Sequence, residues 1–383
     1  MIYGVKVTFF LNRRLILNQV LYFMVITILF TFASQIGYIP DKHIMWKKIF
    51  GFLKYAVFLA AGIAVFWWVY KDEPFDKYKA AFKDLNYFWI LVSLLLSILS
   101  QVSRAVRWNM LIRPLGYKPR LINTYLSVLI LYFVNLLLPR AGEVFRCTIL
   151  SKYEKIPFAK LAGTVFVERM ADLITLMLLA VVIILSQLTV FVSFFNTHPE
   201  VKTNLLQLLS VRNMLLGFLV LGLLVALVLI FRRYYKRKKG DRGNSLIKKI
   251  RLIRQNFMEG IKSIAKLENK GRFIGHTIFI FVMWLFMLFV IFKAYGPTSH
   301  LSLGTGMITF MMGGLAMLAP VQGGIGPWHF MVYETLFIYG IDKADGKVFA
   351  LIAHATTNLI YLVLGLAALL VIQVVNSNRN KAG

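Results

Sequence analysis

Residues 131–172 read LYFVNLLLPRAGEVFRCTILSKYEKIPFAKLAGTVFVERMAD, and the organisation of the whole chain can be worked out from them. An apolar helix is predicted to end near Pro139, because proline cannot donate the backbone hydrogen bond that would continue it. A charged turn follows over residues 140–146, and a second apolar helix then begins. That helix carries three ionisable residues in its first half: Glu168, Arg169 and Asp172. A charge at the centre of a bilayer costs about 2.5–3.5 kcal/mol or more, so we expect these residues to be paired or to line a polar pathway.

The composition is that of an integral membrane protein. The chain has 383 residues, of which 59% are hydrophobic and 16% are charged. A soluble domain is typically about half apolar and about a quarter charged. Apolar runs long enough for one bilayer crossing, about 20 residues, recur along the chain. The formal net charge of +28 would suggest nucleic acid in a soluble protein. Here the basic residues lie in loops beside apolar runs, so we expect no nucleic-acid partner.

Predicted membrane spans alternate with polar loops, which makes the protein multi-pass. The predicted spans are residues 15–36, 49–70, 86–106, 160–186, 213–231, 274–295 and 347–375. Residues 1–44 form an N-terminal extension or an extra span, because the sequence from Met45 also reads as a natural start of a membrane protein. Residues 45–375 then form one transmembrane domain, and residues 376–383 form a cytoplasmic tail.

The basic segment 232–272 is the strongest marker of orientation. Lys and Arg concentrate in cytoplasmic loops, so this segment and the C-terminus are placed in the cytoplasm and the protein in the cell (cytoplasmic) membrane. Apolar residues at helical spacing predict an amphipathic helix on the inner leaflet: Leu246, Ile247, Ile250, Ile253, Phe257, Ile261 and Ile264. The segment either only anchors the topology or also recruits anionic lipid of the inner leaflet.

Two segments do not read as simple crossings. A full crossing by residues 121–138 would put a basic loop outside, so these residues predict a re-entrant hairpin that enters and leaves on the cytoplasmic side. Residues 302–346 are interrupted by glycines and prolines and predict a second hairpin, which opens from the outside. The predicted fold class is therefore an all-α polytopic membrane bundle with two re-entrant or broken helical hairpins. Hairpins that open to opposite sides would make the two halves inverted repeats.

Candidate headgroup-binding residues lie on the two hairpin turns. In the first hairpin they are Arg140, Glu143 and Arg146, and two arginines can hold a phosphodiester by forked, charge-assisted hydrogen bonds. The alternative is an interfacial turn whose arginines only reach up to the membrane surface. In the second hairpin the candidates are Gln322, Trp328 and His329, beside glycines that let a backbone approach a ligand closely.

A polar pathway is predicted from residues of the helices that follow the two turns: Glu168, Arg169, Asp172, His354 and Asn358. The first three lie on adjoining helix faces, since they are one, three and four positions apart. They either line a transport pathway or form an internal salt bridge that locks two helices, and a buried pair is weak evidence for stability. His354 and Asn358 are either a proton-sensitive pair or a satisfied core histidine with its neighbour.

Signatures of common enzyme classes are missing from the sequence. There is no HExxH, P-loop or G-x-S-x-G motif, and the glycines of the second hairpin do not follow a predicted strand as a dinucleotide fingerprint requires. Cys147 is the only cysteine, which leaves no disulfide framework and no cysteine-based metal site. We therefore expect no enzyme activity, no catalytic residue, no cofactor and no metal.

Three motifs resemble those of the lysylphosphatidylglycerol synthase transmembrane (flippase-like) family: residues 138–146 (LPRAGEVFR), 168–172 (ERMAD) and 320–327 (PVQGGIGP). The resemblance covers residues 46–375 and implies a polytopic helical bundle in the bacterial or archaeal cytoplasmic membrane. Relatives in that family translocate aminoacylated phosphatidylglycerol between leaflets, and others are linked to lipid-carrier or glycolipid pathways. The synthases carry a C-terminal catalytic domain, but this sequence ends shortly after its last predicted span, so we do not expect synthase activity.

The leading hypothesis is a flippase or transporter that moves an anionic phospholipid or lipid-linked headgroup between leaflets. The alternative is a non-transporting membrane scaffold or accessory subunit of an envelope-lipid or glycolipid enzyme. A third hypothesis, an intramembrane enzyme acting on a lipid-linked sugar, would have only Glu143 and His329 as acid/base candidates. The sequence does not determine the lipid, the direction of movement or the energy source. The oligomeric state is open as well, and a homo-oligomer is one of the alternatives.

Overall fold

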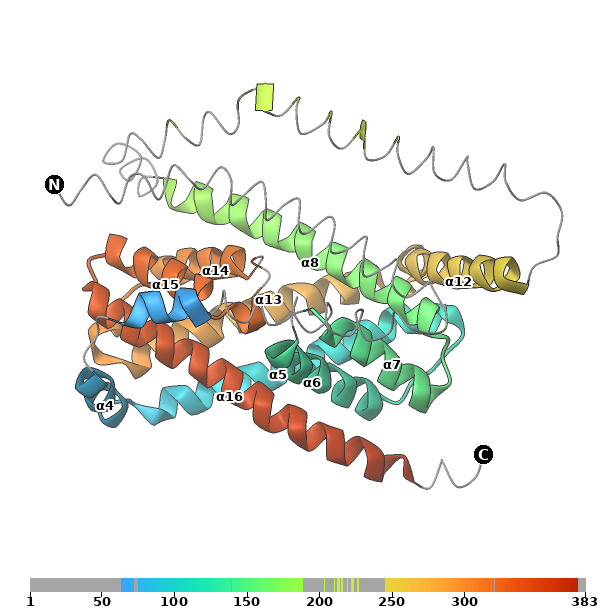
Figure 1. Cartoon of the computed structure of the whole chain (residues 1–383), viewed down its shortest axis with the longest axis horizontal. Helices are drawn as coiled ribbons and strands as arrows, with labels where there is room; N and C mark the ends of the chain where they lie inside the picture. The colour runs from blue at the N-terminus through green and yellow to red at the C-terminus, as the bar shows by residue number, and fades with distance from the viewer. Residues whose placement is uncertain are drawn as a thin grey trace, which may run out of the picture.

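The computed structural model describes residues 63–71, 75–138, 140–188, 245–317 and 321–377, together with Ala319 and single positions between 203 and 226. Every regular element in this part of the chain is a helix (Figure 1), as predicted. Several predicted segments lie outside the described residues, or almost entirely so: the extension 1–44, most of the predicted span 49–70, the predicted span 213–231 with residues 189–212 before it, and the tail beyond Ser377. Pro139 and Pro320 lie outside them as well.

Four long apolar helices form the frame of the described fold: α5 (Tyr87–Ile112), α8 (Phe158–Ser186), α13 (Lys270–Ala294) and α16 (Lys343–Val375). Each is long and apolar enough to cross a membrane, which confirms a polytopic membrane bundle. Three of them begin at a polar cap: Asn86, Asn269 and Asp342 each accept a hydrogen bond from a backbone N–H of the first turn. The sequence therefore places the start of these helices by local chemistry.

The first hairpin consists of α6 (Leu121–Leu137) and α7 (Gly142–Glu154), which pack against each other. At about 1.5 Å per residue neither helix is long enough to cross the roughly 30 Å hydrocarbon core. Gly142 closes the turn, because a Cβ there would lie 2.2 Å from the carbonyl oxygen of Leu131. Its N–H donates to Asn135 Oδ1 at 2.9 Å. The predicted break is thus present, directly beside Pro139.

The second hairpin consists of α14 (Leu303–Ala316) and α15 (Pro327–Ile338), with the short 3-10 helix η4 (Gln322–Gly324) in the turn. Gly323, Gly324 and Gly326 all take positive φ, between 55° and 89°, which explains the glycine-rich sequence. Gly313 lets α14 approach α15, because a Cβ there would lie 2.7 Å from Trp328 Nε1.

Contacts at the helix ends show from which end of the bundle each hairpin opens. At one end, Asn123 in the first turn of α6 is hydrogen-bonded to Glu154 at the end of α7 and to Asn376 at the end of α16. We call this the Arg113 end, because the short helix η1 (Arg113–Leu115) lies there and contacts η2 (Ser263–Lys266).

At the other end, Tyr295 donates to Asp345 at 2.9 Å, and Lys77 of α4 (Phe75–Lys83) forms a 2.8 Å ion pair with the same carboxylate. We call this the Asp345 end. The first hairpin starts and finishes at the Arg113 end. The second starts after residue 301 and finishes at residues 339–342, both at the Asp345 end. The hairpins therefore open in opposite directions.

The order long helix, hairpin, long helix occurs twice, and the equivalent helices run antiparallel. Asn86 at the start of α5 donates to the carbonyl of Ala294 at the end of α13, and Arg107 near the end of α5 meets Thr277 near the start of α13. The helices α8 and α16 also run in opposite directions (Figure 1). In addition, α6 packs on α16 and α14 on α8. This arrangement is that of inverted repeats.

The basic helix α12 (Ser245–Lys262) covers much of the predicted amphipathic helix and packs across the first half of α8 (Figure 1). Gly163 and Gly260 form the crossing: a Cβ on either would lie 2.8 Å from the Cα of the other. Lys160 and Glu259 form a 2.9 Å ion pair beside it. Leu252 and Ile253 on α12 remain exposed, and the position of the helix on a leaflet stays a prediction.

Candidate functional site

Seven charged side chains from three helices meet inside the bundle. We call this set the charge cluster, and its members are Arg104 and Arg107 of α5, Glu143 and Arg146 of α7, and Glu168, Arg169 and Asp172 of α8. Five of them are among the residues predicted from the sequence. The three helices belong to the first repeat, and the hairpin brings α7 against α8.

Glu168 is the centre of the charge cluster, and its side chain is 0% exposed. Its Oε1 lies 2.9 Å from Arg104 Nε, 3.2 Å from Arg107 Nη2 and 2.9 Å from Arg169 Nη2. Its Oε2 lies 3.0 Å from Arg146 Nη1. One buried carboxylate therefore faces four guanidinium groups, which compensates the cost of burying it.

The other two carboxylates lie toward the more open side of the charge cluster. Asp172 lies 2.7 Å from Arg107 Nη1 and 2.6 Å from Arg169 Nη2, and Glu143 lies 2.7 Å from Arg146 Nε. Exposure rises from 12% at Asp172 to 24% at Glu143 and 35% at Arg169, whereas Arg107 and Arg146 are fully buried. Within the described residues, Asp172, Glu143 and Arg169 are therefore the members of the cluster that are partly accessible, and the arginines behind them are closed off.

Positive charge exceeds negative charge in this cluster. With all groups ionised, four guanidinium groups and three carboxylates sum to +1. The buried Nη2 of Arg146 and Nε of Arg107 have no hydrogen-bond partner among the described residues. An unpartnered buried N–H is costly, and an anionic oxygen would satisfy it. The faces of aromatic rings support the arginines, with Arg146 4.5 Å from the ring centre of Trp108.

Arg104 and Arg107 correct the sequence prediction. The hydropathy of the sequence predicts a span over residues 86–106 that ends in a basic cytoplasmic flank beginning with Arg104 and Arg107, but α5 continues to Ile112 and buries both side chains. The basic loop begins only at Arg113. The available signal was their spacing, because residues three apart lie on one helix face. The sequence alone also permits the other interpretation, in which both arginines belong to the basic flank that continues with Arg113.

The predicted residues of the second repeat gather around two histidines. We call His329, His354, Trp328 and Asn358 the histidine group. His354 Nε2 donates to the carbonyl of Gly323 at 2.7 Å, and its Nδ1 accepts from Asn358 at 3.0 Å, so His354 is fully partnered. The rings of His354 and Trp328 are stacked with centres 5.1 Å apart, and the His329 ring is 4.4 Å from His354.

His329 is left with one unused donor. Its Nδ1 accepts from the N–H of Gly326 at 3.3 Å, which places the proton on Nε2. That Nε2 is buried and has no hydrogen-bond partner among the described residues. Gln322 lies in η4, and Arg140 lies in the turn before α7 with φ 61° and an exposed side chain. These two residues occupy the turns, as predicted, but Arg140 is exposed whereas Arg146 is buried.

Two tyrosines lie between the charge cluster and the histidine group. Tyr132 on α6 accepts a hydrogen bond from Arg104, and its ring is stacked on Tyr361 of α16 with centres 4.4 Å apart. Tyr361 lies three positions after Asn358 on the same helix. The two hairpin turns also meet, because a Cβ on Gly323 would lie 3.5 Å from Leu136 and 3.9 Å from Asn358 Nδ2.

A family model described as the lysylphosphatidylglycerol synthase TM region matches residues 52–365. The chain belongs to this family. A UPF0104 membrane protein of Methanocaldococcus jannaschii is 36% identical over 100 residues, which are 25% of this chain and only 30% of that relative. A UPF0104 membrane protein of Pyrococcus horikoshii is 23% identical over 300 residues, or 74% of this chain and 85% of the relative. No solved structure matches the chain.

In this member of the lysylphosphatidylglycerol synthase TM family, the described residues offer charge and hydrogen bonds. They contain no group of three or more His, Cys, Asp or Glu side chains that could hold a metal ion. Cys147 is buried in a cluster of apolar residues. The four guanidinium groups of the charge cluster have the geometry and charge that suit the reversible binding of an anion.

Proposed function

We propose that this family member is a flippase or transporter that moves an anionic, phosphate-bearing lipid or lipid-linked headgroup between leaflets. The observation that carries the proposal is the buried surplus of guanidinium donors, above all the unpartnered Nη2 of Arg146. A phosphate group would neutralise the surplus charge and accept from that donor. A purely structural network would be expected to leave no buried donor unsatisfied.

The architecture supports movement through the bundle rather than binding alone. Two short hairpins open to opposite ends, and their turns meet at Leu136 and Gly323. Inverted repeats of this kind allow one site to face either side of a membrane by motion of one repeat against the other. In this proposal Tyr132 and Tyr361 separate the charge cluster from the histidine group in the resting state.

The same proposal places the protein in the cell membrane with the Arg113 end in the cytoplasm. That end carries many more basic than acidic residues: Arg113, Lys118, Arg120, Lys152, Lys155, Lys262, Lys266 and Lys270. At the Asp345 end, basic residues alternate with Asp76, Asp84, Glu334, Asp342 and Asp345. Under the positive-inside rule the basic helix α12 and the C-terminus are then cytoplasmic, where α12 can meet anionic lipid.

The experiment is a lipid-translocation assay in proteoliposomes with a fluorescent phosphatidylglycerol analogue in both leaflets and an impermeant quencher outside. Arg146→Ala removes the unpartnered donor, and Asp172→Asn removes a charge without changing the shape of the side chain. Each change is expected to lower the translocation rate about tenfold or more, since a charge-assisted hydrogen bond is worth about 1.5–3 kcal/mol.

The matched control is Arg254→Gln, which removes one positive charge from an exposed position on α12; its rate should stay at that of the wild type. Equal rates for all four proteins would overturn the proposal. A wild type no faster than protein-free liposomes would favour the alternative, a scaffold or accessory subunit whose charge cluster is only a clasp between helices.

A further inference from the structure

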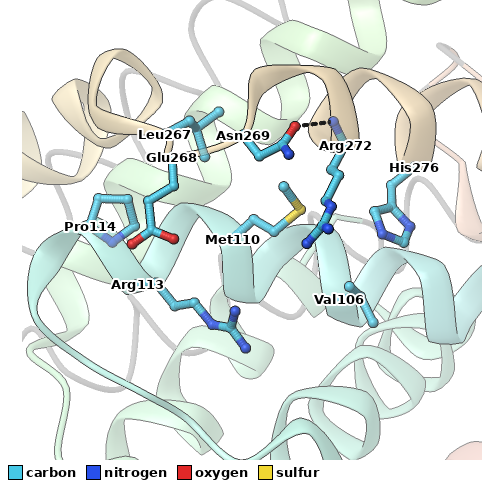
Figure 2. A pocket seen from close by; sticks show the side chains of 9 residues that line it. All are labelled: Val106, Met110, Arg113, Pro114, Leu267, Glu268, Asn269, Arg272 and His276. Atoms are coloured by element: carbon cyan, nitrogen blue, oxygen red, sulfur yellow. Dashed lines mark hydrogen bonds between the residues drawn. The ribbon is translucent and has the colours of Figure 1, made fainter.

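A pocket outside the charge cluster lies at the Arg113 end, between the last turn of α5 and the first turns of α13. Figure 2 shows it with its nine lining residues: Val106, Met110, Arg113, Pro114, Leu267, Glu268, Asn269, Arg272 and His276. Its volume is about 170 Å³. Pockets that enclose drug-sized ligands have roughly 300–1,000 Å³. The space is therefore suited to a headgroup and not to a whole amphiphile.

Two arginines are among the residues that line the pocket, Arg113 of η1 and Arg272 of α13 (Figure 2). Among the described residues neither of them, nor Glu268, forms an ion pair, in contrast to the arginines of the charge cluster. With these three groups ionised the lining carries a formal charge of +1. A pocket with unpaired guanidinium groups selects anions, and the planar fork of arginine fits phosphate oxygens in particular.

Two further donors point to the same ligand. Ser103 Oγ lies 2.9 Å from His276 Nδ1. When the serine donates this hydrogen bond, the proton of the imidazole is on Nε2, which can donate to a ligand in the pocket. The N-terminus of α13 opens beside Asn269, its cap residue, and the positive end of a helix dipole favours an anion. The pocket therefore combines two guanidinium groups, an imidazole and a helix N-terminus.

The rest of the lining is apolar. Val106, Met110, Pro114 and Leu267 form a wall beside the charged groups, and the same faces of α5 and α13 further along expose Leu99, Val102 and Phe279. A charged pocket with an adjoining apolar helix surface fits an amphiphile whose headgroup is bound and whose chains lie along the helix. Free phosphate would use the arginines but not the wall.

The helix α5 keeps this pocket separate from the charge cluster. Val106, Met110 and Arg113 lie on one face of α5, at spacings of four and three residues, and Arg104 and Arg107 lie on another face inside the bundle. We infer that the α5–α13 pocket is a second binding site, for the phosphate of an anionic lipid headgroup held at the membrane surface. The inference does not depend on transport, and it holds for a scaffold as well as for a carrier.

Native mass spectrometry of the full-length protein in detergent, titrated with dihexanoyl-phosphatidylglycerol, tests the inference by counting bound lipids. The double variant Arg113→Gln/Arg272→Gln should lose one bound lipid, or bind it about tenfold more weakly, because two charge-assisted hydrogen bonds are removed. The control Lys71→Gln/Lys83→Gln removes the same charge from exposed positions toward the Asp345 end and should bind lipid as the wild type does.

Each further arm separates one explanation from another. Inorganic phosphate that displaces the lipid at equal concentration would show a free-phosphate site and overturn the lipid assignment. Equal weakening in both double variants would show diffuse electrostatic attraction and also overturn it. Arg146→Ala combined with Arg113→Gln/Arg272→Gln should bind one lipid fewer than Arg146→Ala alone, so failure of the transport proposal and failure of this one give different results. Arg113→Lys/Arg272→Lys keeps both charges and should bind lipid more tightly than Arg113→Gln/Arg272→Gln. This recovery would show that the loss in the glutamine variant comes from the missing charge and not from misfolding.

Discussion

At the scale of single residues, the central feature of the protein is one buried carboxylate whose negative charge is compensated by several arginines. Glu168 is completely buried and faces arginines from three helices: Arg104, Arg107, Arg146 and Arg169. A buried ion network adds little stability compared with apolar packing of the same volume. Removal of one partner is costly, however, because it leaves uncompensated charges behind. Glu168 therefore holds together a group of cations that would otherwise repel each other.

We expect Glu168→Gln to destabilise the protein by about 3–5 kcal/mol, the cost of breaking a buried ion pair. The amide keeps the shape of the side chain, so the loss reports on charge. The measurement is the thermal unfolding midpoint in detergent.

The control for this change is Glu334→Gln, which breaks a partly exposed pair with Lys343 and should cost no more than about 1 kcal/mol. If Glu168→Gln were as mild as the control, the four arginines would not depend on this carboxylate.

At the scale of elements, the hairpins depend on glycines that allow two backbones to approach. Gly142 lies against the carbonyl of Leu131, and Gly323 takes a positive φ where the two turns meet. The hairpin α6–α7 carries Glu143 and Arg146 on α7 to the level of Glu168. A through-going helix would instead place them at different depths of the membrane. The turn therefore positions the charge cluster.

We expect Gly142→Ala to lower the thermal unfolding midpoint and the translocation rate together. The added Cβ would lie 2.2 Å from the carbonyl oxygen of Leu131 and 2.8 Å from Asn135 Oδ1, so the turn must open. Overpacking of this kind costs about 1–3 kcal/mol.

The matched change is Gly275→Ala on α13, where a Cβ meets nothing within 4 Å. It should stabilise the helix by about 0.5–1 kcal/mol. A Gly142→Ala variant as stable as the wild type would contradict the close approach of the turn.

At the scale of the whole molecule, the segments that connect the helices lie at two opposite ends of the bundle. Residues 113–120, 155–157 and 376 lie at the Arg113 end, and residues 84–86, 295–302 and 339–342 lie at the Asp345 end. Because the hairpins open to opposite ends, both repeats contribute a turn to the middle of the bundle. A carrier needs such a meeting point, since one site must become accessible from either side.

Single-cysteine variants test which helix connections lie on the same side of the membrane. They are made in a Cys147→Ser background, because Cys147 is the only cysteine of the chain. Lys118→Cys and Ser377→Cys should react with an impermeant maleimide only when the cytoplasmic face is exposed, in inverted vesicles. His300→Cys and Lys343→Cys should react only in intact cells. Labelling of Lys118→Cys and His300→Cys from the same side would contradict the two ends, whereas a complete exchange of sides would contradict only the proposed orientation.

The sequence by itself determined the class of the protein, the four long spans that the structure describes and both hairpins. Hydropathy, proline, glycine and capping residues act within a few neighbouring positions, so their effect on α5, α6, α14 and α16 can be predicted locally. It also indicated five of the seven charged residues, because Glu168 and Asp172 stand in an apolar run where a charge is costly. The family resemblance rested on the same local motifs.

Only the tertiary structure decided how these charges are paired. Arg104 and Arg107 lie 64 and 61 positions before Glu168, and no local rule distinguishes them from the basic flank that begins at Arg113. Their burial follows from the packing of α5 against α13 and α8, as do the stacking of Tyr132 on Tyr361 and the pocket on the outer face of α5. The transfer free energy of a residue depends on its own chemistry, but its partner depends on which helix faces meet.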